Sequence, residues 1–483
     1  MRQRTLRSTI EWSHALLDEG EQLLLARLAV FSGGRTLEAI EAICDAEGDL
    51  SVGAFEGVSS LVDKSLLRQE EGPEGEPRFV MLETVHEFAR EKLGKSGEAG
   101  RIKRTHAAYF LTLAEEAYPG LRGPHQLEWL ERLEADHDNM RAALSWALGR
   151  KEVEVALRMG GALSGFWSVR DYQSEGRRWL EVALAIEGRV SPEVRAMALA
   201  GTGELALEQG DLDRAEEACE EGLELLEHEA SEARLWLLGF LGWVAWQRED
   251  YRQAQRLFEE GLNLSREMRD LWWIATSLSN LAVVSHSLGD SERATELYEE
   301  SMNFLRERGD KHSLAIILNN LAMVVYSQGD LGRAAQLTEE GVAVYRELGA
   351  RGDVALGLYN LGWIALLQND LGRAADLYKE SLILAWDTGL NPIVQGDLEG
   401  LACLAAARVE PERAARLWGA AQTLHETKSI PRDTDFLAEA DARISAVHTG
   451  MGEQAWEEAW RKRRAMTLDE AISYALEEDE AGA

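Results

Sequence analysis

A six-residue phrase recurs six times between Gly210 and Ala414, and its period constrains the fold more than any other feature of the chain. Most copies join Gly or Asn to Asp, as in Gly289-Asp290, and every copy closes on alanine. The closing alanines lie 39, 40, 40, 40 and 40 residues apart, at Ala215, Ala254, Ala294, Ala334, Ala374 and Ala414. Such a period indicates stacked supersecondary units, none of which can bury its apolar face alone. Arrays of this kind offer extended binding surfaces, so the period favours a binding protein over an enzyme.

Two further positions recur at fixed distances from the closing alanine. Twelve residues before it lies a small residue: Gly203, Gly242, Ala282, Ala322, Gly362 or Ala402. Four residues after it lies a mostly bulky one: Cys219, Phe258, Tyr298, Thr338, Tyr378 or Trp418. Small residues let two helices approach closely, and the bulky side chain fills the adjoining space. The Gly-Asp step predicts that one helix ends in left-handed backbone and that the next begins with a capping aspartate. Each unit is therefore predicted to be an antiparallel helix pair.

This pattern resembles the tetratricopeptide repeat, although that repeat is usually about 34 residues long. The longer period here implies longer helices or longer loops between repeats. An additional weak copy lies between Leu163 and Ala183. We therefore expect an α-solenoid of about seven tetratricopeptide-like helix pairs over residues 151–425, with C-terminal capping helices and an acidic tail over residues 426–483.

Three asparagines, Asn280, Asn320 and Asn360, each lie two residues before the small residue of a first helix. The resemblance implies that first helices line a concave groove, where an asparagine offers a donor and an acceptor to the backbone of a bound peptide. Asparagine has poor helix propensity, so its recurrence within helices needs a reason. The alternative is that each asparagine bonds to its own helix or to the neighbouring repeat. We predict that a protein or peptide ligand, or a small-molecule signal, binds along this line.

The pattern before the repeats is different. Helical stretches are predicted at Ser13–Phe31, Thr36–Cys44, Val52–Lys64 and Thr84–Leu93, and strand-like runs at Ser65–Arg68 and Arg78–Met81 flank a turn at Gly72–Gly75. Three helices followed by a hairpin describe a winged helix. We place this domain at residues 1–95 and a helical linker at residues 96–150.

Three segments of this region, Leu28–Gly34, Leu61–Leu66 and Met81–Val85, resemble the winged helix of bacterial STAND regulators, which are signal-transduction ATPases related to large ATP-binding LuxR-like transcriptional regulators. The segment His106–Leu148 resembles the linker of those proteins, especially at Leu133–Asn139. The resemblance implies a signal-transduction role in which this half senses a ligand. The winged helix would pass the signal to an ATPase domain, supplied in cis or in trans. A cytoplasmic location is predicted separately, because the start of the sequence lacks the apolar stretch of a signal peptide.

The family's ATPase domain carries a phosphate-binding loop that ends in Gly-Lys-Ser/Thr. Gly94-Lys95-Ser96 has Ala89 in place of the loop's first glycine and follows a helix, so we interpret it as a helix stop. We expect neither an ATPase domain nor a cofactor within this chain. Met81, Leu82 and Glu83 occupy the place of the family's nucleotide-sensing Met-His-Asp motif, with Leu82 where the histidine would be.

The alternative function is a DNA-binding transcriptional regulator that acts through the winged helix. Its recognition helix, Val52–Lys64, holds Glu56 and Asp63 but only one lysine. The predicted wing adds four glutamates: Glu70, Glu71, Glu74 and Glu76. The whole chain carries a formal charge of −34. These carboxylates would repel a phosphate backbone, so we expect no nucleic-acid partner.

The sequence contains no recognisable catalytic or metal-binding motif, and we predict that the chain is not an enzyme. Cys44, Cys219 and Cys403 are too far apart for a metal-ligand spacing. Within Asp136–Asn139, we expect Asp138 and Asn139 to bond the local backbone and His137 to be exposed. The most apolar run, Leu235–Trp246, has 12 residues and is too short to span a bilayer.

Overall fold

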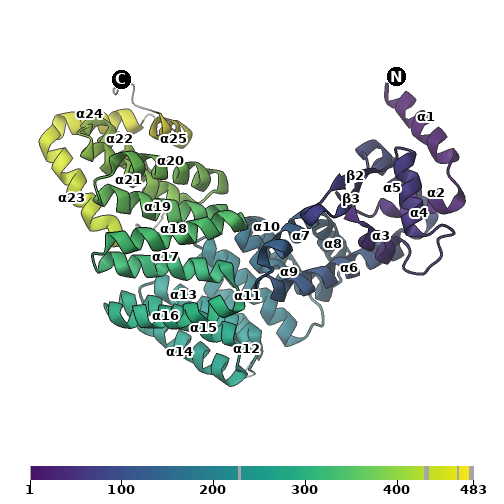
Figure 1. Cartoon of the computed structure of the whole chain (residues 1–483), viewed down its shortest axis with the longest axis horizontal. Coiled ribbons are helices and arrows are strands. Elements are labelled where there is room, and N and C mark those ends of the chain that lie inside the picture. The colour runs from purple at the N-terminus through teal and green to yellow at the C-terminus, as the bar shows by residue number, and fades with distance from the viewer. Residues whose placement is uncertain (1, 227–229, 429–433, 465–466, 478–483) are drawn as a thin grey trace. The chain divides into compact units, whose positions relative to one another are not determined.

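The structure, a computed structural model, describes residues 2–226, 230–428, 434–464 and 467–477. Across these ranges it contains 25 α-helices and three short strands (Figure 1). The chain divides into two compact units, Met1–Ser168 with Tyr172–Trp273, and Val169–Asp171 with Ile274–Ala483. The predicted acidic tail lies largely outside the described residues, since these end at Glu477.

The first unit begins with the predicted winged helix. Its elements are α1 (Arg2–Ala15), α2 (Glu19–Leu28), β1 (Arg35–Thr36), α3 (Leu37–Cys44), α4 (Ala54–Asp63), β2 (Arg68–Glu71), a 3-10 turn (Pro73–Gly75), β3 (Pro77–Val80) and α5 (Glu83–Ser96). β3 lies between β1 and β2 in an antiparallel sheet, where Phe79 pairs with Arg35 on one side and Gln69 on the other.

Two predictions for this domain were wrong in detail. The single helix expected at Ser13–Phe31 is broken before α2, because Asp18 caps that helix by accepting a hydrogen bond from the Glu21 amide at 2.8 Å. The strand expected from Ser65 begins only at Arg68. Ser65 takes a left-handed backbone with φ of 59°, and the amides of the next two residues bond back to the carbonyl of Leu61. Strand β1 was not predicted.

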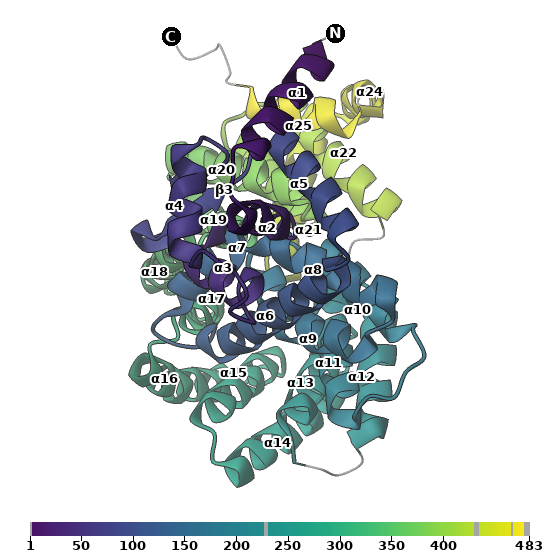
Figure 2. The same ribbon diagram turned by 90° about the vertical axis from the view of Figure 1, so that its right-hand side faces the viewer.

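The linker consists of α6 (Ala99–Gly120), α7 (Gln126–Ala135) and α8 (His137–Arg150). Helices α6 and α8 pack along one another, as both ribbon views show (Figure 2). Their buried apolar side chains include Phe110 and Ala114 on α6 and Leu144 on α8.

The repeats form seven helix pairs within the described residues, which confirms the predicted solenoid. The first unit holds α9 (Val153–Val169) with α10 (Gln173–Leu184), α11 (Pro192–Glu208) with α12 (Leu212–Leu226), and α13 (Glu232–Gln247) with α14 (Tyr251–Met268). The second unit holds α15 (Leu271–Ser287) with α16 (Ser291–Arg308), α17 (Lys311–Ser327) with α18 (Leu331–Leu348), α19 (Arg351–Leu367) with α20 (Leu371–Thr388), and α21 (Asn391–Ala407) with α22 (Pro411–Lys428).

The repeated phrase forms the turn inside six of the seven pairs, from α11–α12 to α21–α22. Gly289 has φ of 87°, and Asp290 accepts a hydrogen bond from the amide of Arg293 at 3.0 Å. The corresponding aspartates Asp250, Asp330 and Asp370 cap their helices in the same way. The left-handed residue before the aspartate is glycine, asparagine or, before Asp250, Glu249, and the aspartate satisfies a free amide of the next helix.

The small and bulky positions of the repeat meet inside the pairs whose small residue is glycine. A Cβ atom placed on Gly362 of α19 would lie 2.8 Å from the Tyr378 ring of α20. A Cβ on Gly242 of α13 would likewise overlap the ring of Phe258 in α14. The glycines let the helix backbones approach while the rings fill the space between them.

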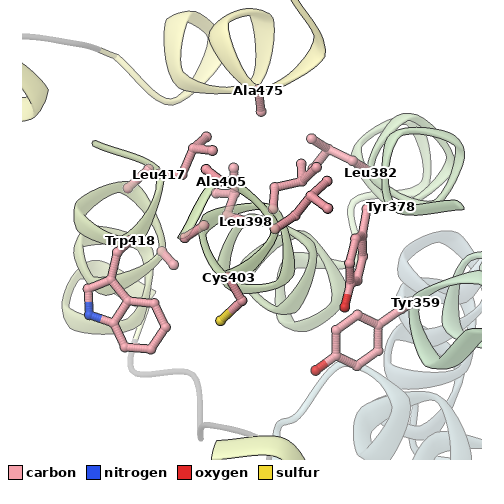
Figure 3. Close-up of a cluster of buried hydrophobic side chains, with 14 of the residues drawn as sticks. Tyr359, Tyr378, Leu382, Leu398, Cys403, Ala405, Leu417, Trp418 and Ala475 are labelled. Carbon is pink, nitrogen blue, oxygen red and sulfur yellow. The ribbon is translucent and has the colours of Figure 1, made fainter. Parts of the chain in front are cut away.

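Three helices follow the repeats: α23 (Thr434–Met451), α24 (Glu453–Arg464) and α25 (Leu468–Leu476). Helix α25 packs on α20 and α22, and α23 packs on α21 and α22. A single buried cluster joins them to the last repeats, with Tyr378, Leu398 and Trp418 among its members (Figure 3). Across the described part of the chain, no helix is both long and apolar enough to cross a membrane.

Candidate functional site

The three asparagines predicted to face a ligand have different surroundings. Asn280 of α15 and Asn320 of α17 are half-buried, whereas Asn360 of α19 is 4% exposed. The Nδ2 group of Asn360 donates a hydrogen bond to Oδ1 of Asn319, at 3.1 Å, on the preceding repeat. Asn360 thus makes the bond to a neighbouring repeat that the sequence left open as the alternative.

Asn320 interacts with a residue of the array. Burial raises the pKa of Tyr298 in α16, and the interaction with the Asn320 side chain opposes that rise. The ligand-facing role of the asparagine line stays a prediction, and Asn280 and Asn320 are its more accessible members.

The second unit holds an aromatic cluster that the sequence did not predict. Phe436 of α23 is 3% exposed and packs against the first helices of two successive repeats. Its ring centroid lies 5.3 Å from that of Tyr326 in α17, 5.7 Å from that of Tyr359 and 4.9 Å from that of Trp363 in α19. The indole Nε1 of Trp363 donates to the Tyr326 hydroxyl at 3.2 Å. We call the surface formed by Tyr326, Tyr359, Trp363, Gln395 and Cys403 the first-helix surface.

The first-helix surface extends onto α21. Gln395, Glu399 and Cys403 follow one another at intervals of four residues and therefore share a face of that helix. Nε2 of Gln395 donates to Oε1 of Glu399 at 3.3 Å. Burial raises the pKa of Cys403 to about 12, and the positive charge of Arg443 in α23 opposes the rise. Helix α23 therefore lies close to this face of α21.

Polar atoms are buried in this region without a hydrogen-bond partner among the described residues. They include Oε1 of Gln395 and the hydroxyl of Tyr378. Gln395 is 2% exposed and Tyr378 is fully buried. In Figure 3 the side chains of Tyr359, Tyr378 and Cys403 point toward the same space beside α21. Buried polar groups are usually paired, so these two atoms distinguish this part of the array from an ordinary core.

A second polar cluster joins the winged helix to the linker in the first unit. Arg78 of β3 and Asp136, between α7 and α8, form a buried ion pair with an Nη2–Oδ1 distance of 2.6 Å. Asn139 accepts from the Ser32 amide at 2.8 Å and donates to the Gly34 carbonyl at 3.0 Å. The turn between α2 and β1 is thereby tied to α8.

The expectation that His137 is exposed and that Asn139 bonds the local backbone was wrong. His137 is 3% exposed, and its Nε2 atom accepts a hydrogen bond from Nε1 of Trp167 in α9 at 3.2 Å. Asn139 bonds to residues more than a hundred positions away. The segment Asp136–Asn139 therefore contacts both the winged helix and the first repeat, which no local rule could reveal.

The nucleotide-sensor-like residues lie at the start of α5. Met81 is buried, whereas Leu82, the N-cap residue of α5, is 42% exposed and Glu83 is exposed. Leu82 has no side chain that could bond a phosphate, and the sensor role of these three residues stays a prediction.

The face of the winged helix that would contact DNA in the alternative function carries exposed acidic and apolar side chains. Phe55 of α4 is 64% exposed with Glu56 exposed beside it, and all four residues of β2 are exposed, including Glu70 and Glu71. For the residues that the structure describes, no group of three or more His, Cys, Asp or Glu side chains could hold a metal ion.

Comparison with known protein families supports both parts of this architecture. The family model of the winged helix-turn-helix domain matches residues 17–94. The tetratricopeptide repeat model matches residues 194–267 and 273–347. The N-terminal winged helix and the tetratricopeptide repeats are thus established features of the chain.

Among curated proteins, the chain is similar to provisionally named HTH-type transcriptional regulators of Mycobacterium tuberculosis and Mycobacterium bovis. Each is 39% identical over 204 residues, which is 41% of this chain and 23% of the relative. The chain thus matches about a quarter of the length of these relatives.

Two solved structures align with the chain, and the first of them has a TM-score above 0.5. A Rap protein in complex with Competence and Sporulation Factor aligns with a TM-score of 0.53 and 11% identity, over 76% of this chain and 99% of that one. A STAND protein with a tetratricopeptide repeat sensor from Pyrococcus horikoshii aligns with a TM-score of 0.46 and 18% identity, over 90% of this chain and 66% of that one.

Proposed function

We propose that the chain is the signal-sensing and protein-interaction part of a STAND-type transcriptional regulator, located in the cytoplasm and without catalytic activity of its own. Its repeats bind a protein, peptide or small-molecule signal along the first helices. The proposal rests on one observation: the ring of Phe436 packs against the rings of Tyr326, Tyr359 and Trp363. The first helices already accept an aromatic anchor from a helix outside the repeats, which is how helical ligands are commonly held.

The joint around Asp136 supports a role in transmission. The buried ion pair to Arg78 and the bond from Trp167 to His137 link β3, the linker and α9 through adjacent residues. A conformational change in α9 would therefore be transmitted to the winged helix through these contacts. An ATPase domain, in cis or in trans, is the partner that we propose for the winged helix, with ligand binding shifting the balance between two states.

Peptides selected from a display library against the full chain would test the ligand-binding role. We expect Asn320→Ala to weaken binding of the selected peptides in titration calorimetry, and the triple change at Asn280, Asn320 and Asn360 to weaken it further. Gln336→Ala, at an exposed position on the second helix α18, is the matched control and should leave the affinity unchanged. Circular dichroism would check that each variant is folded. Equal affinities for the wild type and the triple variant would place the ligand elsewhere.

DNA binding through the winged helix is the second candidate, because the mycobacterial relatives are named as HTH-type regulators. A gel-shift experiment at low salt tests it, since electrostatic binding is then strongest. The exposed Glu56, Glu70 and Glu71 lead us to expect no retardation. A shifted band that weakens steeply with added salt would favour DNA binding over the sensing role.

A further inference from the structure

Helix α23 is amphipathic and lies on the repeats through a narrow apolar stripe. Phe436, Ala440 and Ile444 are 3%, 1% and 4% exposed, and Val447 packs against the same cluster. Their spacing of four, four and three residues places them on one face of the helix. Exposed residues such as Ser445 lie between them. This is the pattern of a helix whose apolar face is laid into a receptor surface.

The stripe meets the first helices of three successive repeats. Phe436 packs on α17 and α19. Further along α23, the charge of Arg443 opposes the raised pKa values of Tyr378 and Cys403, which places Arg443 near the residues beside α21. Helix α23 therefore crosses the repeats instead of continuing their sequence of antiparallel pairs.

Some polar atoms buried near α23 have no hydrogen-bond partner among the described residues. Oε1 of Gln395 and the hydroxyl of Tyr378 are buried, yet no described residue bonds to them. The buried side chains of the α23 stripe, Phe436, Ala440 and Ile444, offer no donor or acceptor. A helix that brought a hydrogen-bonding side chain to Gln395 or Tyr378 would satisfy groups that α23 leaves unpaired, and unpaired buried groups weaken a complex.

We propose that the first-helix surface is a docking site for an amphipathic helix of a partner protein, and that α23 is the intramolecular occupant which this helix displaces. The partner helix carries an aromatic anchor at the place of Phe436 and a hydrogen-bonding side chain facing Gln395. The inference rests on the proposed function and deepens it, because it names the class of partner and the segment that competes with it. Because α23 is part of the same chain, its effective concentration at the first-helix surface is high. The apparent affinity for the partner helix is therefore the intrinsic affinity multiplied by the fraction of molecules in which α23 has left that surface.

A fluorescent peptide with the sequence of residues 434–451 tests the proposal by anisotropy titration with the full chain. We expect Phe436→Ala in the chain to increase affinity for the wild-type peptide at least about tenfold, because the in-chain competitor is weakened. Ser445→Ala, on the exposed side of α23, should bind as the wild-type chain does. A peptide carrying Phe436→Ala should not bind any of the chains.

Hydrogen exchange in α23 reports whether the substitution has released the helix. If α23 exchanges faster in the Phe436→Ala chain and the peptide still does not bind, the docking site does not exist. Equal binding to the wild-type and Phe436→Ala chains would show that α23 does not compete. If Phe436→Ala leaves the exchange unchanged, Ile444→Asp introduces a charge into the stripe, and failure of the peptide to bind that chain overturns the proposal.

The outcome can be separated from that of the proposed function. If library peptides bind in a way that depends on Asn320 but the peptide of residues 434–451 does not bind the released chain, only the docking inference is contradicted. If library peptides fail and the peptide of residues 434–451 binds only the released chain, the docking site stands and the asparagine line is not the ligand site.

Discussion

Arg78 and Asp136, 58 residues apart, form an ion pair in which the two side chains are only 7% and 6% exposed. Arg78 also donates to the carbonyls of Gly34 and Ala135, and Asn139 donates to Oδ1 of Asp136 at 3.1 Å. The pair therefore has hydrogen-bond partners on both sides, which a buried ion pair needs in order to offset the loss of solvation. It fixes the linker to β3 at the point where the winged helix meets the helical part of the unit.

Asp136→Ala should destabilise this joint by about 3–5 kcal/mol, because it leaves the Arg78 charge buried without its partner. The double change Arg78→Met with Asp136→Leu should recover most of the loss, since neither charge then remains. Native-state hydrogen exchange in β3 and α8 measures the free energy of local opening. Glu38→Ala is the control: it breaks an exposed ion pair with Arg132 across the same junction and should cost less than about 1 kcal/mol.

Two glycines of α13 should respond to alanine with opposite signs. Gly242→Ala places a methyl group against the buried ring of Phe258 and should lower the free energy of unfolding by about 1–3 kcal/mol. A Cβ atom placed on Gly239 would meet nothing within 4 Å outside its own stretch of helix, so Gly239→Ala should raise that free energy by about 0.5–1 kcal/mol through helix propensity. Thermal unfolding of both variants under one condition checks the signs. Equal shifts would mean that the small position of the repeat has no packing role.

Asp330 of the repeated phrase should contribute to stability through capping alone. Asp330 accepts a hydrogen bond from the Arg333 amide at 3.0 Å and is otherwise exposed. Asp330→Ala should destabilise the start of α18 by about 1 kcal/mol, whereas Asp330→Asn keeps an oxygen acceptor and should cost little. Hydrogen exchange in the first turn of α18 distinguishes them. An equal effect of the two changes would point to the charge instead of the cap.

The helix pairs were predictable because their signals are local. A left-handed Gly289 next to a capping Asp290 fixes where one helix ends and the next begins, whatever the rest of the chain does. The same holds for the small and bulky positions, since Gly362 and Tyr378 lie within one pair. A period of this kind therefore predicts both the element type and the packing inside each unit.

The contacts between distant segments were not predictable from this sequence. The stripe of α23 shows that one face is buried, but periodicity cannot name the surface that covers it. The segment Asp136–Asn139 reads as an ordinary helix start until Arg78 and Trp167 are placed beside it. Asn360 likewise has the spacing of a ligand-facing residue, but its amide is bonded to Asn319. In each case the partner comes from another element, and a single sequence carries no signal for it.

The joint between winged helix and linker should weaken in acid because of His106. This residue of α6 is 2% exposed, and its ring centroid lies 4.7 Å from that of Phe110 and 5.5 Å from that of Phe31. Burial lowers the pKa of His106 from 6.5 to about 4, and a hydrogen bond with Asn139 opposes the shift. Below pH 6.5 the unfolded chain therefore takes up a proton that the folded chain does not. The stabilisation is complete above pH 6.5 and is lost as the pH falls toward 4, with a total of about 3 kcal/mol.

Thermal unfolding between pH 4 and pH 7 measures this dependence. His106→Leu replaces the titrating group with an apolar side chain. The stability of this variant should therefore fall less steeply between pH 7 and pH 4 than that of the wild type. The exposed His125 provides the matched control, and His125→Leu should keep the wild-type slope. Identical slopes for all three proteins would mean that protonation of His106 is not what loosens the joint. A selective loss in His106→Leu, together with faster hydrogen exchange in α6 of the wild type at low pH, would locate the acid sensitivity between Phe31, His106 and Asn139.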